Sequence, residues 1–396
     1  MADHIPFVTG KDVCSLVNEL YSDSAFARVP LDKAEGLLDL LDETTSLWLD
    51  PSVDGMDDVE TRRSRLGPDG KKKRKNSWFE FMRKLPNFEK IATPPYGANA
   101  AEVHAFVKEV MDRCAAHRPA WITVPQFPLV TDSKRNKINR AMAAATGKWK
   151  ISSGFSGRLI LPLVFTHQRQ VKLKADRNSK VKQAEMCYNL AQADGLWVVE
   201  SSLGDEKGSS TLRKRLSSVI ALHEELNDRI PARIRIAGPY WGLNLVLWAR
   251  NLVDYPAIGI GTGYQYLLAG GPSHQASAKL ALASLRRRVG VKQLGKWLDS
   301  AMRALGPSHP ADADLRDIRR NRVVLSDPAR AKKQVAKAYK QWFDMIAAAP
   351  EAGRPMALYQ DLSAAFALGR SLPPLPEAGP ARRPEAVAEP LMLNCL

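Results

Sequence analysis

The chain contains few of the features that name a protein's chemistry. Its 396 residues include only four cysteines, and no two of them form a Cys-x-x-Cys pair. Cys114 lies near His117, but no second pair completes a metal site, so the sequence predicts reduced thiols and no bound metal. Neither of two common nucleotide-binding glycine motifs, G-x-G-x-x-G after the first predicted strand or G-x-x-x-x-G-K-[ST], is present. We therefore predict no cofactor.

Long apolar runs are also absent. Polar or charged residues interrupt every apolar stretch well before the roughly 20 residues that a membrane-spanning helix needs. Residues 1–6 lack the basic and apolar regions of a signal peptide. We expect no membrane partner and a cytoplasmic location. With 45% apolar and 25% charged residues, the composition excludes collagen-like and wholly disordered proteins.

Acidic residues become scarce after residue 60. Residues 1–60 hold 14 acidic and three basic side chains, whereas the whole chain has a net charge of +16. The remainder therefore carries +27. Such asymmetry is typical of a surface for nucleic acid or another polyanion, or of an acidic segment that packs against a basic body.

Basic residues gather in three clusters. The first, in a predicted loop, consists of Lys71, Lys72, Lys73, Arg74 and Lys75. The second opens a predicted helix with Lys134, Arg135 and Lys137, and the third is spread over residues 158–182. We predict that the first two clusters contact nucleic acid, because cations neutralise its phosphates.

Aromatic residues follow the first cluster directly. Trp78, Phe79 and Phe81 mingle with Arg83 and Lys84, a mixture that single-stranded nucleic acid uses for stacking and phosphate contacts. The alternative is a helix capped at residue 77 whose apolar stripe anchors the loop. The two interpretations are compatible.

The order of the predicted elements favours a barrel. Short apolar runs alternate with amphipathic stretches from residue 46 onward, which indicates an α/β protein with a parallel sheet. Six strands are predicted at residues 46–50, 120–124, 159–164, 196–200, 233–237 and 257–260, and helices at 133–145, 179–193, 210–228, 241–253 and 275–289. Six serial units fit a (β/α)-barrel of the TIM type better than an open Rossmann-like sheet. Whether the barrel is complete stays open, with residues 88–93 or 322–325 as candidates for a missing strand.

The sequence suggests four regions. Residues 1–45 are predicted to be an acidic helical lead-in, with one helix that begins at residue 9 or 11 and ends at 20, and another over 31–41. Residues 46–290 form the barrel-like domain, with a basic loop insertion at 67–90. Residues 291–370 are a helical extension, and 371–396 a proline-rich disordered tail.

The predicted strand ends supply candidate catalytic residues, because barrel enzymes place reactive groups there. Asp50 and Glu200 each end a strand, and two carboxylates across a barrel mouth suit acid–base cleavage of a glycosidic bond. His167 follows another strand, and a histidine side chain can do acid–base work near neutral pH. The alternatives are a salt bridge or helix cap for Glu200, a turn at Pro51 for Asp50, and an ordinary hydrogen bond for His167.

Aromatic and glycine residues near the strand ends complete the candidate site. Those predicted to stack on a base or sugar ring are Tyr240, Trp241, Tyr264 and Tyr266. Gly261 and Gly263 are predicted to cradle an anion with their backbone N–H groups. Core packing explains Trp241 equally well, since Trp248 lies seven residues further on the same predicted helix.

Three functions fit these features. The first is a barrel enzyme that acts on a nucleic acid or nucleotide-like substrate by carboxylate acid–base chemistry. The second is a non-catalytic nucleic-acid-binding or sensing protein, for example in a bacterial antiviral defence or mobile-element system. The third is a small-molecule, glycosidase-like hydrolase whose positive charge serves solubility alone. The sequence does not decide whether the protein is an enzyme.

Overall fold

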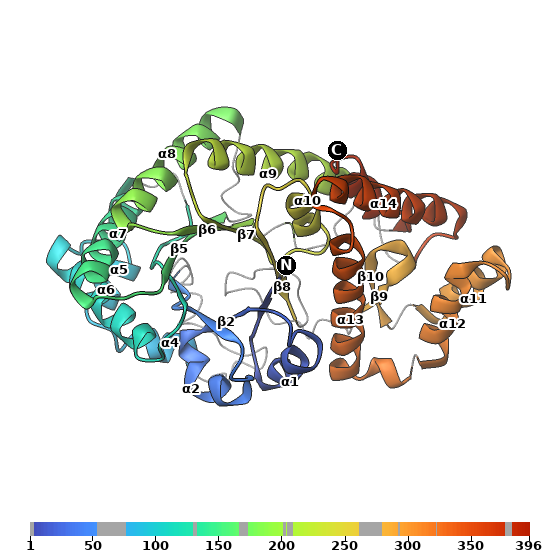
Figure 1. Ribbon diagram of the computed structural model, residues 1–396, viewed down its shortest axis with the longest axis horizontal. Helices are drawn as coiled ribbons and strands as arrows, with labels where there is room; N and C mark the ends of the chain where they lie inside the picture. The colour runs from blue at the N-terminus through green and yellow to red at the C-terminus, as the bar shows by residue number, and fades with distance from the viewer. Residues whose placement is uncertain are drawn as a thin grey trace.

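A closed barrel of eight parallel strands forms the centre of the protein (Figure 1). The computed structural model describes residues 4–53, 77–129, 133–165, 173–200, 203, 209–260, 279–291, 294–321, 323–376 and 382–396. The strands pair in chain order, and β1 pairs with β8 to close the ring. They are β1 (Ile5–Phe7), β2 (Phe26–Pro30), β3 (Ser46–Asp50), β4 (Trp121–Thr123), β5 (Arg158–Phe165), β6 (Gly195–Glu200), β7 (Ile234–Ala237) and β8 (Tyr255–Gly259). The barrel predicted from the sequence is confirmed.

The two strands missing from the sequence prediction lie at the N-terminus. β1 and β2 fall inside residues 1–45, which the sequence analysis assigned to helices alone. β1 is three residues long, and β2 contains Arg28 and Pro30, so neither gives a clear apolar run. The proposed replacements are wrong, because residues 88–92 are helical and Val324–Ser326 is a 3-10 turn.

Helices surround most of the barrel. From α1 to α9 they are α1 (Lys11–Leu20), α2 (Ala34–Leu37), α4 (Ser77–Met82), α5 (Phe88–Ala92), α6 (Ala100–Ala115), α7 (Ser133–Ser153), α8 (Leu173–Ala191) and α9 (Ser209–Arg229). α6 begins with a capping box, in which the side chains of Asn99 and Glu102 each accept the other's backbone N–H. α7 and α8 pack closely at Gly147, where a Cβ atom would lie 2.4 Å from the carbonyl oxygen of Leu190.

A small helical unit follows β8. It contains the antiparallel strands β9 (Lys279–Leu282) and β10 (Arg287–Gly290), then α11 (Leu294–Leu305) and α12 (Pro310–Asn321). The helix predicted over 275–289 is therefore wrong for residues 279–289, where the buried, alternating Leu280, Leu282 and Val289 face a core of their own. α13 (Pro328–Ala347) lies between this unit and the barrel (Figure 1).

The short helix α10 (Leu243–Ala249), after β7, is buried on every side. A helix that is apolar all round needs a second layer of protein over it. α14 (Arg354–Ser371) supplies this cover beside α13, and Trp248 stacks on Phe343 of α13 with ring centres 4.8 Å apart. The helical extension therefore completes the barrel's outer layer.

The acidic N-terminal region pairs with the basic α13, as the charge asymmetry suggested. Asp12, Glu19 and Asp23 form ion pairs with Lys332, Lys333 and Lys340, respectively. These residues are more than 300 positions apart in the chain. These three ion pairs account for part of the charge asymmetry and link α1 and the segment after it to α13.

The C-terminal segment is ordered where the structure describes it. Residues 388–392 form the helix α15 (Ala388–Met392), which packs on α14 and α9. Val387, Leu391 and Cys395 are buried. The prediction of a disordered tail is therefore wrong for residues 382–396. Their apolar side chains are too scattered to form a local sequence pattern, but they are buried against α14 and α9.

Candidate functional site at the carboxyl end of the barrel

Side chains on the barrel strands alternate between the interior and the helix layer. On β6, Trp197 and Val199 belong to the interior cluster, whereas Leu196 and Val198 pack outward against the helices. On β3, Trp48 faces inward in the same way. Alternation is the rule for strands, so this pattern fixes the direction of the residues that end each strand.

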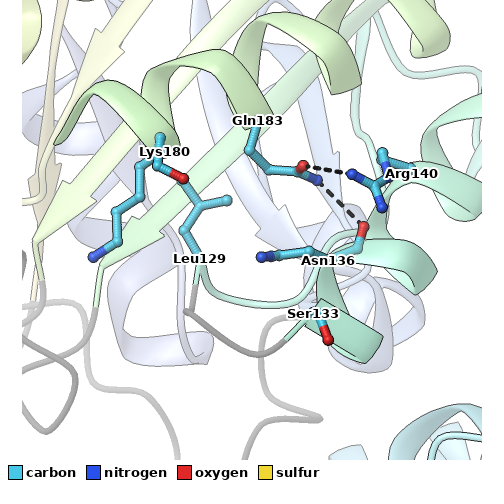
Figure 2. A pocket seen from close by; sticks show the side chains of 7 residues that line it. Leu129, Ser133, Asn136, Arg140, Lys180 and Gln183 are labelled. Carbon is cyan, nitrogen blue, oxygen red and sulfur yellow. Dashed lines mark hydrogen bonds between the residues drawn. The ribbon is translucent and has the colours of Figure 1, made fainter. Parts of the chain in front are cut away.

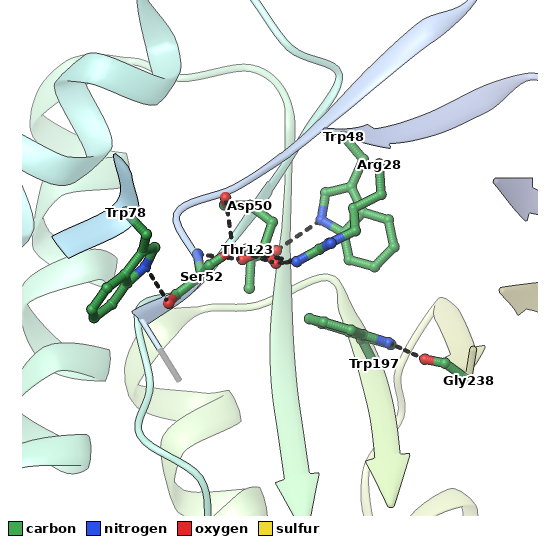
Figure 3. A network of polar contacts seen from close by, with 8 residues as sticks. All are labelled: Arg28, Trp48, Asp50, Ser52, Trp78, Thr123, Trp197 and Gly238. Atoms are coloured by element: carbon green, nitrogen blue, oxygen red, sulfur yellow. Dashed lines mark hydrogen bonds and ion pairs between the residues drawn. The ribbon is translucent and has the colours of Figure 1, made fainter. Parts of the chain in front are cut away.

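Asp50, the last residue of β3, faces the barrel interior and forms a buried ion pair with Arg28 of β2 (Figure 3). Asp50 is 1% exposed and Arg28 is 4% exposed. The Arg28 guanidinium lies 4.6 Å from the ring centre of Phe7 and 5.3 Å from that of Trp197. Aromatic faces attract a cation, so they help to hold the guanidinium in this apolar interior.

The second oxygen of Asp50 is also engaged. The backbone N–H of Ser52 donates to Asp50 Oδ1 at 2.8 Å, which closes the turn that Pro51 suggested in the sequence. Trp78 Nε1 donates to the Ser52 carbonyl oxygen at 3.1 Å (Figure 3). A carboxylate that accepts from a guanidinium and a backbone N–H is held in one orientation. This favours a positioning role for Asp50 over proton transfer.

Glu200 ends β6 but faces the helix layer, because Val199 before it faces inward. Its carboxylate pairs with Arg215 of α9 at 3.3 Å, and its backbone N–H donates to the Tyr240 hydroxyl oxygen. Asp50 and Glu200 therefore do not face each other across the barrel mouth. The geometry matches the salt-bridge alternative for Glu200 and gives no support to a carboxylate pair.

Tyr240 and Trp241 lie inside the protein, so neither offers a ring face to a substrate. Burial raises the pKa of the Tyr240 hydroxyl, which stays protonated. Its oxygen accepts the backbone N–H of Glu200 and so helps to fix the end of β6. Trp241 Nε1 donates to the carbonyl oxygen of Arg286 at 2.8 Å, and its ring packs beside Tyr339. Trp241 thus joins the barrel to the unit of β9 and β10, which corrects the stacking prediction for both residues.

The basic run at the start of α7 divides between surface and core. Lys134 and Lys137 are exposed. Arg135 is 1% exposed, with its guanidinium 5.4 Å from the ring centre of Tyr96 and 5.1 Å from that of Phe127. The prediction that Arg135 contacts nucleic acid is therefore wrong, because this side chain anchors α7 to the loop after β4.

A polar cavity of about 230 Å³ lies between α7 and α8 (Figure 2). Its described lining is Leu129, Ser133, Asn136, Arg140, Ser179, Lys180 and Gln183. Leu129 N–H donates to the carbonyl oxygen of Val164 on β5 at 2.9 Å, which places the cavity beside the carboxyl end of that strand. Gln183 links the two helices by accepting from Arg140 at 3.4 Å and donating to the Asn136 carbonyl oxygen at 3.3 Å.

The remaining predicted site residues lie outside the described parts of the chain. They are Lys71, Lys72, Lys73, Arg74, Lys75, His167, Gly261, Gly263, Tyr264 and Tyr266. Their predicted roles stay predictions.

Two important residues escaped the sequence analysis. The sequence does offer an indication for Arg28. It lies between the apolar Ala27 and Val29, so on a strand its charge points to the face opposite theirs, which is the barrel interior. Lys180 appeared as one of many basic residues on a helix. Only the packing of α8 against β5 distinguishes it from its exposed neighbour Lys182.

Other functional groups are sparse among the described residues. There, no group of three His, Cys, Asp or Glu side chains is arranged to hold a metal ion, and no helix is long and apolar enough to cross a membrane. The four cysteines are free and buried. Burial raises the pKa of the Cys187 and Cys395 thiols to about 12, so these two thiols are unreactive near neutral pH.

No protein-family description matches the sequence, and no curated protein matches it significantly. The class of the protein therefore follows from its fold, an eight-stranded (β/α) barrel with a helical extension.

Proposed function

We propose that this barrel binds a nucleic acid or a nucleotide-like polyanion at the carboxyl end of β4 and β5. The observation that carries the proposal is the charge on the adjoining starts of α7 and α8. Residues 133–140 of α7 and 173–184 of α8 together contain eight Lys or Arg residues and one Asp, and of the eight Arg135 is buried. Dense positive charge of this kind binds phosphates with little sequence preference.

The location of these cations supports the same function. Binding sites of β/α barrels lie at the carboxyl end of the strands, in the segments that lead into the helices. Lys134, Lys137 and Lys182 are exposed there, and Lys180 lies 5.8 Å from the ring centre of Phe165, the last residue of β5. The positive charge therefore occupies the functional end of the fold.

The connection after β3 starts and ends beside this face. Val53 and Trp78, on either side of the segment that is not described, are both held at the carboxyl end of β3 through Ser52. Lys71, Lys72, Lys73, Arg74 and Lys75 belong to that connection. We extend the proposal to these five residues as further phosphate contacts.

Neutralising the exposed lysines of this face should weaken binding in a salt-dependent way. The triple variant Lys134→Gln, Lys137→Gln, Lys182→Gln removes three exposed cations. Each phosphate contact contributes about −0.7 to the slope of log K against log salt for a single strand, so the slope should become shallower by about 2. Fluorescence anisotropy with short DNA and RNA, single- and double-stranded, measures this across a salt series.

A matched control separates local contacts from net charge. The triple variant Lys296→Gln, Arg320→Gln, Lys337→Gln removes three exposed cations from α11, α12 and α13. Its slope should equal that of the unchanged protein. Equal losses in both variants, or no binding by the unchanged protein at low salt, would contradict the proposal and favour a small-molecule substrate.

A further inference from the structure

A second cavity lies at the amino end of the barrel, opposite the face proposed for the polyanion. Its volume is about 1010 Å³. Asp23, Arg235 and Asp254 line it from the starts of β2, β7 and β8, and Phe343 and Arg354 line it from α13 and α14. Ligand sites commonly have volumes of roughly 300–1,000 Å³, so this cavity has room for an organic molecule.

One side of the cavity has an excess of negative charge. Lys340 of α13 bridges Asp23 and Asp344, with its Nζ atom 3.0 Å and 2.9 Å from their carboxylate oxygens. Both carboxylates line the cavity, and so does Glu351, which is exposed and forms no ion pair with a described residue. Because one ammonium group serves two of these three carboxylates, negative charge remains available for a cation.

Arg354 adds a positive charge that is not neutralised within the described part of the chain. The other arginine of the lining, Arg235, donates to both carboxylate oxygens of Asp254, at 2.7 and 3.1 Å. Arg354 has no such partner there, and its buried Nε makes no hydrogen bond. Its guanidinium lies 4.4 Å from the ring centre of Trp248, which also stacks on Phe343. A guanidinium held over a ring keeps the donors at its edge available for a planar anion.

We infer that this cavity binds a ligand with both a carboxylate and an ammonium group, the chemistry of an amino acid or a peptide. Arg354 holds the carboxylate, because a guanidinium matches its two oxygens in a fork. The ammonium group lies on the side of Asp344 and Glu351, where the negative charge is in excess. A nucleic acid lacks the positive group and is repelled by the same carboxylates, so this site is separate from the polyanion face.

Isothermal titration calorimetry on the full-length protein tests the inference with three probes: L-lysine, trilysine and trilysine amide. The amide keeps the ammonium groups of trilysine but lacks its carboxylate. We expect trilysine to bind at least tenfold more tightly than its amide, and Arg354→Gln to abolish this difference. Glu351→Gln should weaken both peptides several-fold. L-lysine that binds as tightly as trilysine indicates a free amino acid as the source, and tighter trilysine indicates a peptide.

Arg370→Gln is the matched control, because Arg370 also lies on α14 with its guanidinium 6.0 Å from the ring centre of Phe366. This residue is exposed and outside the cavity, so the preference for trilysine over its amide should stay unchanged. Arg354→Lys keeps the charge without the fork and should reduce the preference at least threefold. Thermal melting shows which variants are folded, and either Arg354 variant suffices for the test.

Three results would overturn the inference: no binding of any probe, equal binding of trilysine and its amide, or a preference that persists at full size in the folded Arg354 variants. An equal loss in Arg370→Gln would also contradict it. Oligonucleotide binding tests the proposed function separately, because these substitutions lie at the other end of the barrel and should leave it unchanged.

Discussion

Replacing Asp50 with alanine should lower the free energy of unfolding by about 3–5 kcal/mol, because the Arg28 guanidinium then stays in the barrel interior without its carboxylate. Both partners are nearly inaccessible to water, at 1% and 4% exposed. Arg28→Met should cost a similar amount, since it leaves the Asp50 carboxylate buried with one fewer partner. Urea denaturation followed by tryptophan fluorescence measures both changes.

The double variant Arg28→Met, Asp50→Leu separates the ion pair from simple packing. Replacing both buried charges with apolar groups removes the uncompensated charge, so the double variant should be more stable than either single one. Lys108→Ala breaks the exposed pair with Asp112 on α6 and should cost less than about 1 kcal/mol. Single effects near that of Lys108→Ala would contradict the buried ion pair.

Replacing Leu391 with alanine should cost about 2–5 kcal/mol, as expected for a fully buried leucine. Leu391 lies in α15 and packs against the start of α10, where a Cβ atom on Gly242 would lie 2.6 Å from Leu391 Cδ1. The backbone of Gly242 has φ +83°, a conformation that suits glycine, so the chain approaches the leucine without hindrance. The C-terminal segment thus covers the region after β7.

Leu393→Ala provides the matched control two residues further on. Leu393 is 53% exposed, so its truncation should change the free energy of unfolding by no more than about 0.5 kcal/mol. A small effect for Leu391→Ala, equal to that of Leu393→Ala, would mean that α15 does not pack as described.

The sequence was sufficient for the strands whose local pattern is strong. Six barrel strands follow from runs of buried apolar residues, and β3 matches its predicted bounds of residues 46–50. β1 and β2 could not be found this way, because a three-residue strand is too short for a pattern and Arg28 interrupts the other. β1 forms because it pairs with β2 and with β8, and β2 because it pairs with β1 and β3. The pairing with β8 depends on residues distant in the chain, which a local pattern does not contain.

The candidate site was harder to predict because it depends on the direction and burial of single side chains. Asp50 and Glu200 both end strands, yet alternation turns one inward and the other toward α9. Arg135 and Lys137 are two residues apart on one helix, and the first is buried while the second is exposed. Charge alone in the sequence does not distinguish a core anchor from a binding residue.

Hydrogen–deuterium exchange with and without a bound oligonucleotide tests most directly where the polyanion binds. At low salt and saturating DNA or RNA, we predict slower exchange in residues 133–140 and 177–184, at the adjoining starts of α7 and α8. Exchange in α11 and α12 should stay unchanged. Slower exchange confined to other parts of the protein, or none at saturation, would contradict the assignment of the binding face to the carboxyl end of β4 and β5.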